Sequence, residues 1–270
     1  MNISLIPIEI INVTINDNSM DIRDKLYFIS SCKLYLDNIT IHTLKYYHDV
    51  NNYVLTQPKF LHLKELILGG INKINISHLT NLTKLRIITK ICNFNWGNKR
   101  ISQCDIMPLT KLLYLDVGHN HSINNVAHLT NLTYLNIRCT NINQESINYL
   151  PNLILLKLGC RSNVTYISHL TNLTYLNINT CRPQFTPASH FGQDEIIKLS
   201  GLRTLKISHN MNITNISHLV SLTKLNIDGR FCKIDQDSIN NLHSLTYLSM
   251  KNNLGIYDTK HLTNLTKLIK

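Results

Sequence analysis

The stretch ISHLTNLTYLNI, from Ile167 to Ile178, decides the fold because nearly the same text recurs along the chain. Three close copies begin at Ile76, Val126 and Ile216, and a shorter one, KHLTNLTKLIK, follows them. A spacing of about 20 residues predicts a solenoid, since one short coil cannot bury its apolar edge but stacked copies share a core. The first apolar residues of the L-x-x-L-x-L cores are Phe60, Leu79, Leu109, Leu129, Leu150, Leu170, Leu199, Leu219, Leu242 and Leu262.

Within each repeat, the sequence predicts a short strand and a return segment. In a typical copy, we expect Leu222, Leu225 and Ile227 to point inward and the residues between them to point outward. Apolar residues stand at every third position of the return segments, which favours extended or 3₁₀ backbone over a full helix. QESINYL, from Gln144, and QDSINNL, from Gln236, are expected to be more helical. The prediction is about ten coils whose strands form one parallel sheet.

The pattern L-x-x-L-x-L-x-x-N resembles the leucine-rich-repeat family in its short, internalin-like form. The resemblance implies an α/β solenoid with a parallel sheet on its concave face. It also implies that the asparagines stack as a ladder that satisfies backbone amides where each coil turns. Thr140, Arg161, Cys181 and Arg230 occupy the asparagine position in other repeats, so we expect an interrupted ladder. The pattern is carried by Leu112-Leu115-Val117-Asn120, Leu202-Leu205-Ile207-Asn210 and Leu245-Leu248-Met250-Asn253.

Residues 1–50 do not follow the repeat register and are predicted to form a helical head, with the solenoid at 51–270. The text Ile6-Pro7-Ile8-Glu9-Ile10, followed by Asp24, Leu26 and Cys32-Lys33, resembles an F-box. The resemblance implies an adaptor of a cullin-type ubiquitin ligase, in which the repeats hold the protein to be ubiquitinated. The alternative is a plain binding or scaffold module whose helices only cap the exposed end of the solenoid. The residues implied to dock onto the Skp1 adaptor are Ile6, Pro7, Ile10, Ile11 and Leu26.

The composition predicts an intracellular protein that does not enter the membrane. The chain contains no apolar run of about 18 residues, the length that spans a bilayer. Its first residues, MNISLIPIEI, lack the basic start of a signal peptide and include Glu9. Seven cysteines without CxxC pairs favour reduced thiols. The bias toward Asn, Ile, Lys and Tyr resembles proteins of giant viruses of amoebae, which implies the cytoplasm of a host cell.

No catalytic, cofactor or metal site is expected from the sequence. It has no Gly-rich phosphate loop and no HExxH or GxSxG motif. Five histidines precede the returning leucine of their repeats and are expected to stack in a column. Metal ligands must converge on one point, so repeat duplication explains the column better than metal binding. The histidines are His78, His128, His169, His218 and His261.

The outward strand positions carry the predicted function, which is to bind a target protein. Tyr and Arg are enriched at protein-recognition surfaces, although tyrosines on neighbouring strands also pack against each other. The net charge of +11 and the basic residues on this face favour an acidic segment as the partner. Nucleic acid is disfavoured because the positive charge is dispersed and no nucleic-acid motif is present. The predicted target-binding residues are Lys84, Arg86, Tyr114, Asp116, Tyr134, Asn136, Lys157, Tyr175, Asn177, Lys206, Lys224 and Tyr247.

Two long intervals, residues 88–108 and 179–198, interrupt the repeat register. They contain Trp96, the only tryptophan, and three of the six phenylalanines. Aromatic residues on loops are typical anchors for a binding partner. They serve equally well to cover extra core at an irregular coil, and both interpretations stay open.

Overall fold

The computed structural model describes residues 42–46, 55, 60–69, 73–88, 101–159, 162–179 and 191–270. The chain divides into two compact units, Met1–Ile123 and Asn124–Lys270, and each is described by itself. The described part of the first unit contains β1 (Thr43–Tyr46), β2 (Glu65–Leu68), β3 (Lys84–Ile87), α4 (Gln103–Ile106) and β4 (Tyr114–Asp116). That of the second contains β5 (Tyr134–Asn136), α5 (Gln144–Asn148), β6 (Leu155–Lys157), β7 (Tyr175–Asn177), α6 (Gln193–Ile197), β8 (Thr204–Lys206), β9 (Lys224–Asn226), α7 (Gln236–Ile239), β10 (Tyr247–Ser249) and β11 (Lys267–Ile269).

In the first unit, β1 to β4 form a parallel sheet in sequence order. Leu44, Leu66, Leu85 and Leu115 stand in one row across the four strands, and all are buried. This row is inward because alternate residues of a strand face the same side. β1 pairs with β2 although it belongs to residues 1–50, so the parallel sheet begins inside the range that was assigned to the head.

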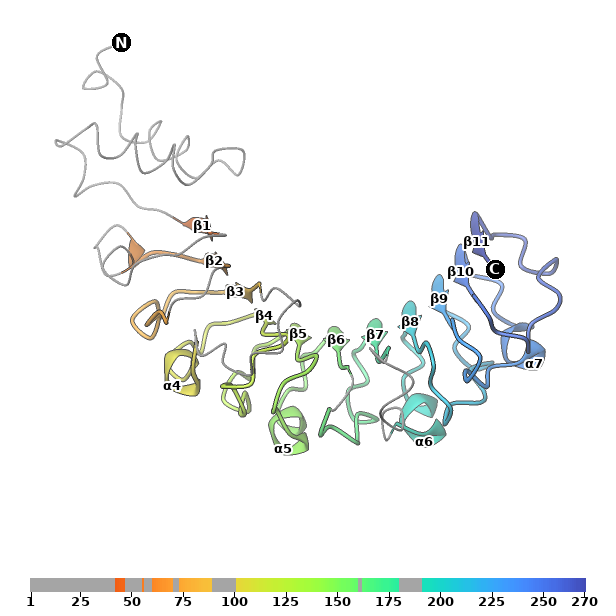
Figure 1. Ribbon diagram of the computed structural model, residues 1–270, viewed down its shortest axis with the longest axis horizontal. Helices are drawn as coiled ribbons and strands as arrows, with labels where there is room; N and C mark the ends of the chain where they lie inside the picture. Colours follow the sequence, from red (N-terminus) through yellow and green to blue (C-terminus); the bar gives the residue numbers. More distant parts are fainter. Residues whose placement is uncertain are drawn as a thin grey trace, which may run out of the picture. The chain divides into compact units, whose positions relative to one another are not determined.

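In the second unit, β5 to β11 form a parallel sheet that also follows the sequence order. Figure 1 shows these strands along the inner side of a curve, with α5, α6 and α7 along its outer side. Tyr134, Leu155 and Tyr175 are in register across β5, β6 and β7, as the alignment of the repeats predicted. The central leucines of β5 to β10 are fully buried. The predicted parallel solenoid is therefore confirmed, and its outward positions in this unit share one surface.

The return segments are built from single hydrogen-bonded turns. The Leu129 N–H donates to the Val126 carbonyl and the Leu132 N–H to the Leu129 carbonyl, both at 3.0 Å. The same three-residue bonds recur in the other coils, which confirms the expected 3₁₀-like backbone. Helices α5 and α7 confirm the two more helical copies.

Both long intervals end in short helices, which the repeat register did not predict. α4 begins after Ser102, whose backbone N–H donates to the Asp105 carboxylate at 2.7 Å. This S-x-x-D text is a helix-start signal. α6 follows Phe191, which is fully buried, so at least one aromatic of the intervals covers core. Residues 89–100 and 180–190, and Trp96 with them, lie outside the described residues.

The polar residues of the repeated text join each coil to the one before it. In the opening stretch, the Asn172 amide donates to the Pro151 carbonyl at 3.1 Å, and the Thr174 hydroxyl donates to the Ile154 carbonyl at 3.5 Å. His169 Nε2 lies 3.4 Å from the carbonyl oxygen of Ile147. Equivalent bonds form at Asn81, Asn152, Asn264, Thr83, Thr223, Thr246, Thr266, His78, His218 and His261. The text recurs in part because its His, Asn and second Thr positions bond to carbonyls of the preceding coil.

The asparagine ladder is present and interrupted, as expected. Asn210 is fully buried, and its Oδ1 accepts from the backbone N–H groups of Asn212 and Ile213 at 2.8 and 3.0 Å. Asn120 and Asn253 also accept backbone N–H bonds from the turns that follow them. In other repeats, the Thr140 hydroxyl donates to the Ile137 carbonyl and accepts from the Ile142 N–H. Arg230 is exposed and so interrupts the ladder. Arg161 and Cys181 lie outside the described residues.

Candidate functional site

The sheet face of the second unit carries alternating tyrosine and lysine side chains. Lys157, on β6, reaches back to Tyr134, on β5, and its Nζ donates to the hydroxyl oxygen at 2.8 Å. The same Nζ lies 5.1 Å from the centre of the Tyr134 ring, much farther than the 2.8 Å that separates it from the hydroxyl oxygen at the edge of the ring. The nitrogen therefore lies beyond the hydroxyl, and the contact is a hydrogen bond rather than a cation–π interaction.

Tyr175, on β7, lies between two lysines. The Nζ atoms of Lys157 and Lys206 lie 5.8 and 6.0 Å from the centre of its ring. Both distances are near the outer limit of about 6 Å for a cation–π contact, so the attraction is weak. The two tyrosines and these two lysines are half-buried, so part of each side chain remains accessible to a partner.

The lysines on this face have no acidic neighbour in the sheet. The outward positions of β5 to β11 hold four lysines and no Asp or Glu. None of the four forms a salt bridge within the part of the chain that the structure describes. The carboxylate of Asp228, which follows β9, also reaches this surface and accepts from the outward residues Asn226 and Ser249. The four lysines outnumber this acid, so the surface is electropositive and favours a negatively charged partner. The lysines are Lys157, Lys206, Lys224 and Lys267.

The sheet face of the first unit is different, because four of its charged side chains form ion pairs, while Lys45, on β1, forms no salt bridge within the described residues. Lys84 Nζ lies 2.9 Å from a carboxylate oxygen of Glu65, and Arg86 Nε lies 3.6 Å from the carboxylate of Asp116. Lys84 also lies 5.2 Å from the centre of the Tyr114 ring. Asp116 is only 8% exposed. The predicted target-binding residues Lys84 and Arg86 therefore lie in ion pairs, Lys84 with Glu65 and Arg86 with the predicted Asp116.

Two predicted target-binding residues of the second unit face their own turns. The Oδ1 atom of Asn136 accepts from the Arg138 backbone N–H at 3.3 Å, and that of Asn177 accepts from Asn179 at 3.0 Å. Such bonds, two residues along the chain, are typical of Asx turns. Asn177 is only 7% exposed. These asparagines shape the ends of β5 and β7, and the accessible part of the face consists mainly of tyrosine and lysine.

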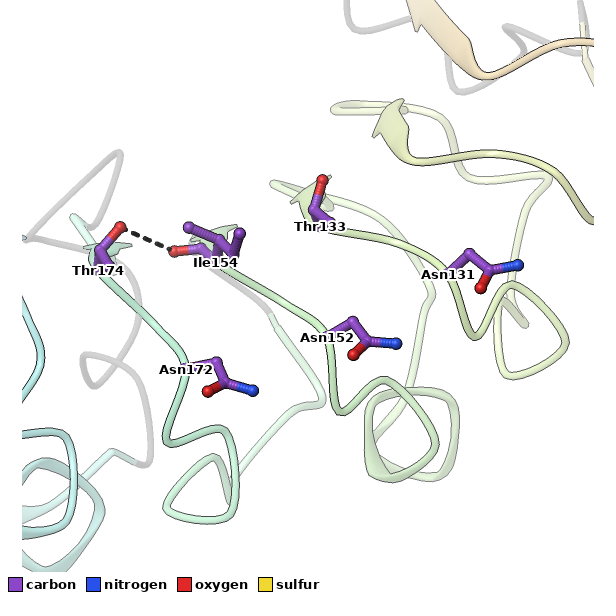
Figure 2. Close-up of a pocket in the computed structure, with 6 residues that line it drawn as sticks. All are labelled: Asn131, Thr133, Asn152, Ile154, Asn172 and Thr174. Atoms are coloured by element: carbon purple, nitrogen blue, oxygen red, sulfur yellow. Dashed lines mark hydrogen bonds between the residues drawn. The ribbon is translucent and has the colours of Figure 1, made fainter.

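A shallow groove runs along the edge where β5, β6 and β7 begin, and sequence reasoning did not single it out. Figure 2 shows its lining residues on three successive coils, with Ile154 in the middle. The groove is open, with a volume of about 420 Å³. Its polar groups already serve coil stacking, since Asn152 and Asn172 donate to carbonyls of the preceding coil. The lining contains no titratable side chain: Asn131, Thr133, Asn152, Ile154, Asn172 and Thr174.

The histidine column is explained by the coil-to-coil bonds already described. His218 and His261 lie 3.2 and 3.3 Å from the carbonyl oxygens of Ile196 and Ile239. Among the described residues, no three His, Cys, Asp or Glu side chains gather as a metal site would require.

Burial raises the pKa of the Cys232 thiol to about 11, which opposes formation of the reactive thiolate.

Other sequence predictions fall outside the described residues or concern the membrane. The five residues predicted to dock onto Skp1 lie in residues 1–41, which the structure does not describe. In the described part of the chain, every helix is too short or too polar to cross a bilayer.

Comparisons with known proteins show the fold. No protein-family model matches the chain, and no curated protein matches its sequence. Among solved structures, it is similar to the functional domain of InlJ from Listeria monocytogenes, described as including a cysteine ladder, with 19% identity and a TM-score of 0.51. The match covers 83% of this chain and 57% of that one, so the chain spans little more than half of the InlJ domain. This likeness supports the leucine-rich-repeat fold.

Two further internalins of the same bacterium have lower TM-scores. The internalin inlF matches with 18% identity and a TM-score of 0.44, covering 97% of this chain and 93% of that one. Internalin C2 matches with 21% identity and a TM-score of 0.46, covering 62% of this chain and 75% of that one. The assignment of the fold rests on the parallel coils and on the InlJ likeness rather than on these two structures.

Proposed function

We propose that this protein is a non-enzymatic protein-binding module, and that the sheet face of its second unit holds an acidic segment of a partner. The observation that carries the proposal is the set of lysines on this face that form no salt bridge within the described residues. Surface charges without an opposite charge nearby increase the rate of association with an oppositely charged partner. They also disfavour partners of the same charge. The proposed binding surface consists of Tyr134, Lys157, Tyr175, Lys206, Lys224 and Tyr247.

The tyrosines supply the part of the affinity that charge alone does not. Tyr134 is held by the hydrogen bond from Lys157, so little of its side-chain freedom remains to be lost on binding, whereas the lysines beside Tyr175 attract it only weakly. Half-buried aromatic side chains among charged residues are frequent hot spots. Lys84, Arg86 and Asp116 of the first unit stay outside this proposed surface, because they already form ion pairs.

The test is direct binding of a short fluorescent peptide of Glu, Ser and Gly residues, followed by anisotropy. Lys157→Glu combined with Lys206→Glu is expected to weaken binding by about tenfold or more, because attraction becomes repulsion. The matched control is Lys198→Glu with Lys260→Glu, which changes the net charge equally away from the sheet face. An equal loss in both variants would show that only net charge attracts the peptide, and would refute a site on the face. Duplex DNA is expected to bind weakly and to respond equally to both pairs of changes.

The finer proposal is that the module serves as the substrate-recognition subunit of a Skp1-containing ubiquitin ligase. It is supported by the F-box-like text in residues 6–33, and therefore by sequence alone. The test is co-precipitation of Skp1 with the full chain and with Pro7→Ala combined with Ile10→Asp. We expect the double variant to lose Skp1, since a charge in an apolar contact is costly. Undiminished co-precipitation would favour the plain binding module with a capping head.

A further inference from the structure

The turns that follow β8, β9 and β10 stack directly on one another. Each contains a residue in the left-handed backbone region: His209 at φ 61°, Gly229 at φ 109° and Asn252 at φ 57°. The His209 N–H donates to the Asp228 carbonyl at 3.0 Å, and the Gly229 N–H donates to the Lys251 carbonyl at 2.7 Å. A Cβ atom on Gly229 would collide with the His209 ring, which lies against it. These contacts fix which residues of the three turns are neighbours.

Two residues after each left-handed position stands an exposed apolar side chain. Met211 is 39% exposed, Phe231 is 52% exposed and Leu254 is 91% exposed. With neighbouring strands about 4.8 Å apart, the three form a continuous row roughly 10 Å long, here called the apolar ridge. The equivalent position after Cys139, the left-handed residue that follows β5, is the polar Asn141. The apolar character is therefore a property of these three coils and not of the repeat.

The surroundings of the apolar ridge are basic. Arg230 and Lys233 flank Phe231 in sequence, Lys251 precedes Leu254, and all three cations are exposed. Two acids lie near the ridge: Asp228, which accepts from the Ser249 hydroxyl at 2.7 Å and the Lys251 N–H at 2.8 Å, and Asp235, which lies beside Gly255 and caps α7. The three cations outnumber them. The sheet face that leads into these turns carries Lys206 on β8 and Lys224 on β9. Apolar and positive surface thus lie side by side.

We propose that the apolar ridge is the second half of the partner site and takes the apolar side chains of the same acidic segment. This inference rests on the proposed function of the sheet face. An exposed apolar row bordered by charge is typical of an interaction surface. Charge complementarity identifies the occupant: the cations beside the ridge attract an acidic chain. They also oppose self-association, because a second copy would bring its own Arg230, Lys233 and Lys251 against this patch.

The test compares two fluorescent peptides on the full chain. One is the acidic peptide of Glu, Ser and Gly, and the other replaces three of its serines with leucine. We expect the leucine peptide to bind about tenfold more tightly, since burying even one leucine against the ridge supplies that much affinity. Met211→Ser with Phe231→Ser and Leu254→Ser should remove this gain and leave binding of the serine peptide unchanged. The matched control, Ile197→Ser with Val220→Ser, changes exposed apolar residues outside the ridge and should preserve the gain.

The outcomes separate the ridge from the sheet face. If the serine peptide binds through Lys157 and Lys206 but leucine adds nothing, or if the control removes the gain equally, the ridge inference is wrong while the sheet-face proposal stands. If neither peptide binds, the acidic-partner proposal fails and the ridge inference falls with it. A concentration-dependent dimer in light scattering that the three serine changes dissolve would assign the ridge to a second copy and overturn the proposal.

Discussion

The two sheet faces of this protein use the same outward positions in opposite ways. In the first unit, Glu65 pairs with Lys84 and Asp116 pairs with Arg86. In the second, Lys157 and Lys206 contact tyrosines and have no acid beside them on the sheet. Inward leucines dictate the coil, so outward residues are free to vary without changing the fold. The same repeat therefore carries one surface whose charges are mostly paired, here called the closed face, and one whose lysines form no salt bridge among the described residues, the open face.

If the two units share the same buried core, equivalent core substitutions should destabilise them equally. Leu85→Ala, in β3, and Leu176→Ala, in β7, should each reduce the free energy of unfolding by about 3 kcal/mol, since both side chains are fully buried. Urea unfolding followed by circular dichroism measures this effect, with the exposed Lys224→Ala as the control. A loss below about 1 kcal/mol in one unit alone would show that its core is not equivalent.

The tyrosines sharpen the comparison at the open face. Tyr134→Ala with Tyr175→Ala should weaken binding of the acidic peptide by about 2 kcal/mol, the typical contribution of an aromatic hot spot. The matched change in the closed face, Tyr114→Ala, should leave binding unchanged. Anisotropy titrations and melting temperatures are measured on the same samples. A large fall in melting temperature with intact peptide binding would mean that the tyrosine–lysine contacts serve packing rather than recognition.

The smallest expected effect comes from opening the closed face. Glu65→Gln removes the acid beside Lys84 and should change stability by no more than about 0.5 kcal/mol, because the ion pair is partly exposed. In a chain that already carries Lys157→Glu and Lys206→Glu, it should restore a few-fold gain in affinity for the acidic peptide. Titrations at low and high salt measure that gain, which should disappear as screening increases. A stability loss above about 1.5 kcal/mol would assign Glu65 a structural role instead.

The strands could be predicted because they follow the repeat, whereas the parts of the chain that depart from the repeat could not. The inward leucines and the row of Tyr134, Leu155 and Tyr175 follow from aligning the repeats, since each strand adds one layer in register. Helix α6 was missed because its interval breaks that alignment. The low exposure of Asn177 was not predicted, because its side chain accepts a local bond from the Asn179 backbone instead of extending into solvent. Whether the N-terminal head forms an F-box stays a prediction, because its residues lie outside the described ones.

The apolar ridge shows what alignment of the repeats leaves open. Met211, Phe231 and Leu254 each follow the asparagine position of their repeats, so the alignment alone places them in one row. Their exposure does not follow from the alignment, because the apolar neighbours Ile213 and Cys232 are buried. Which apolar side chains of a turn face solvent is visible only in the structure.

The bonds that join each coil to the one before it also bear on how such a chain changes length. Asn172 and Thr174 supply the donors that reach the preceding coil, while the same stretch of backbone offers carbonyls to the coil that follows. A duplicated or deleted segment of one full period therefore arrives with its own donors and leaves no orphaned carbonyl at the seam. Addition of a whole repeat keeps every coil-to-coil hydrogen bond, whereas loss of a few residues leaves several polar groups without partners at once. Recombination within the gene can lengthen the binding surface stepwise while each intermediate remains a folded protein.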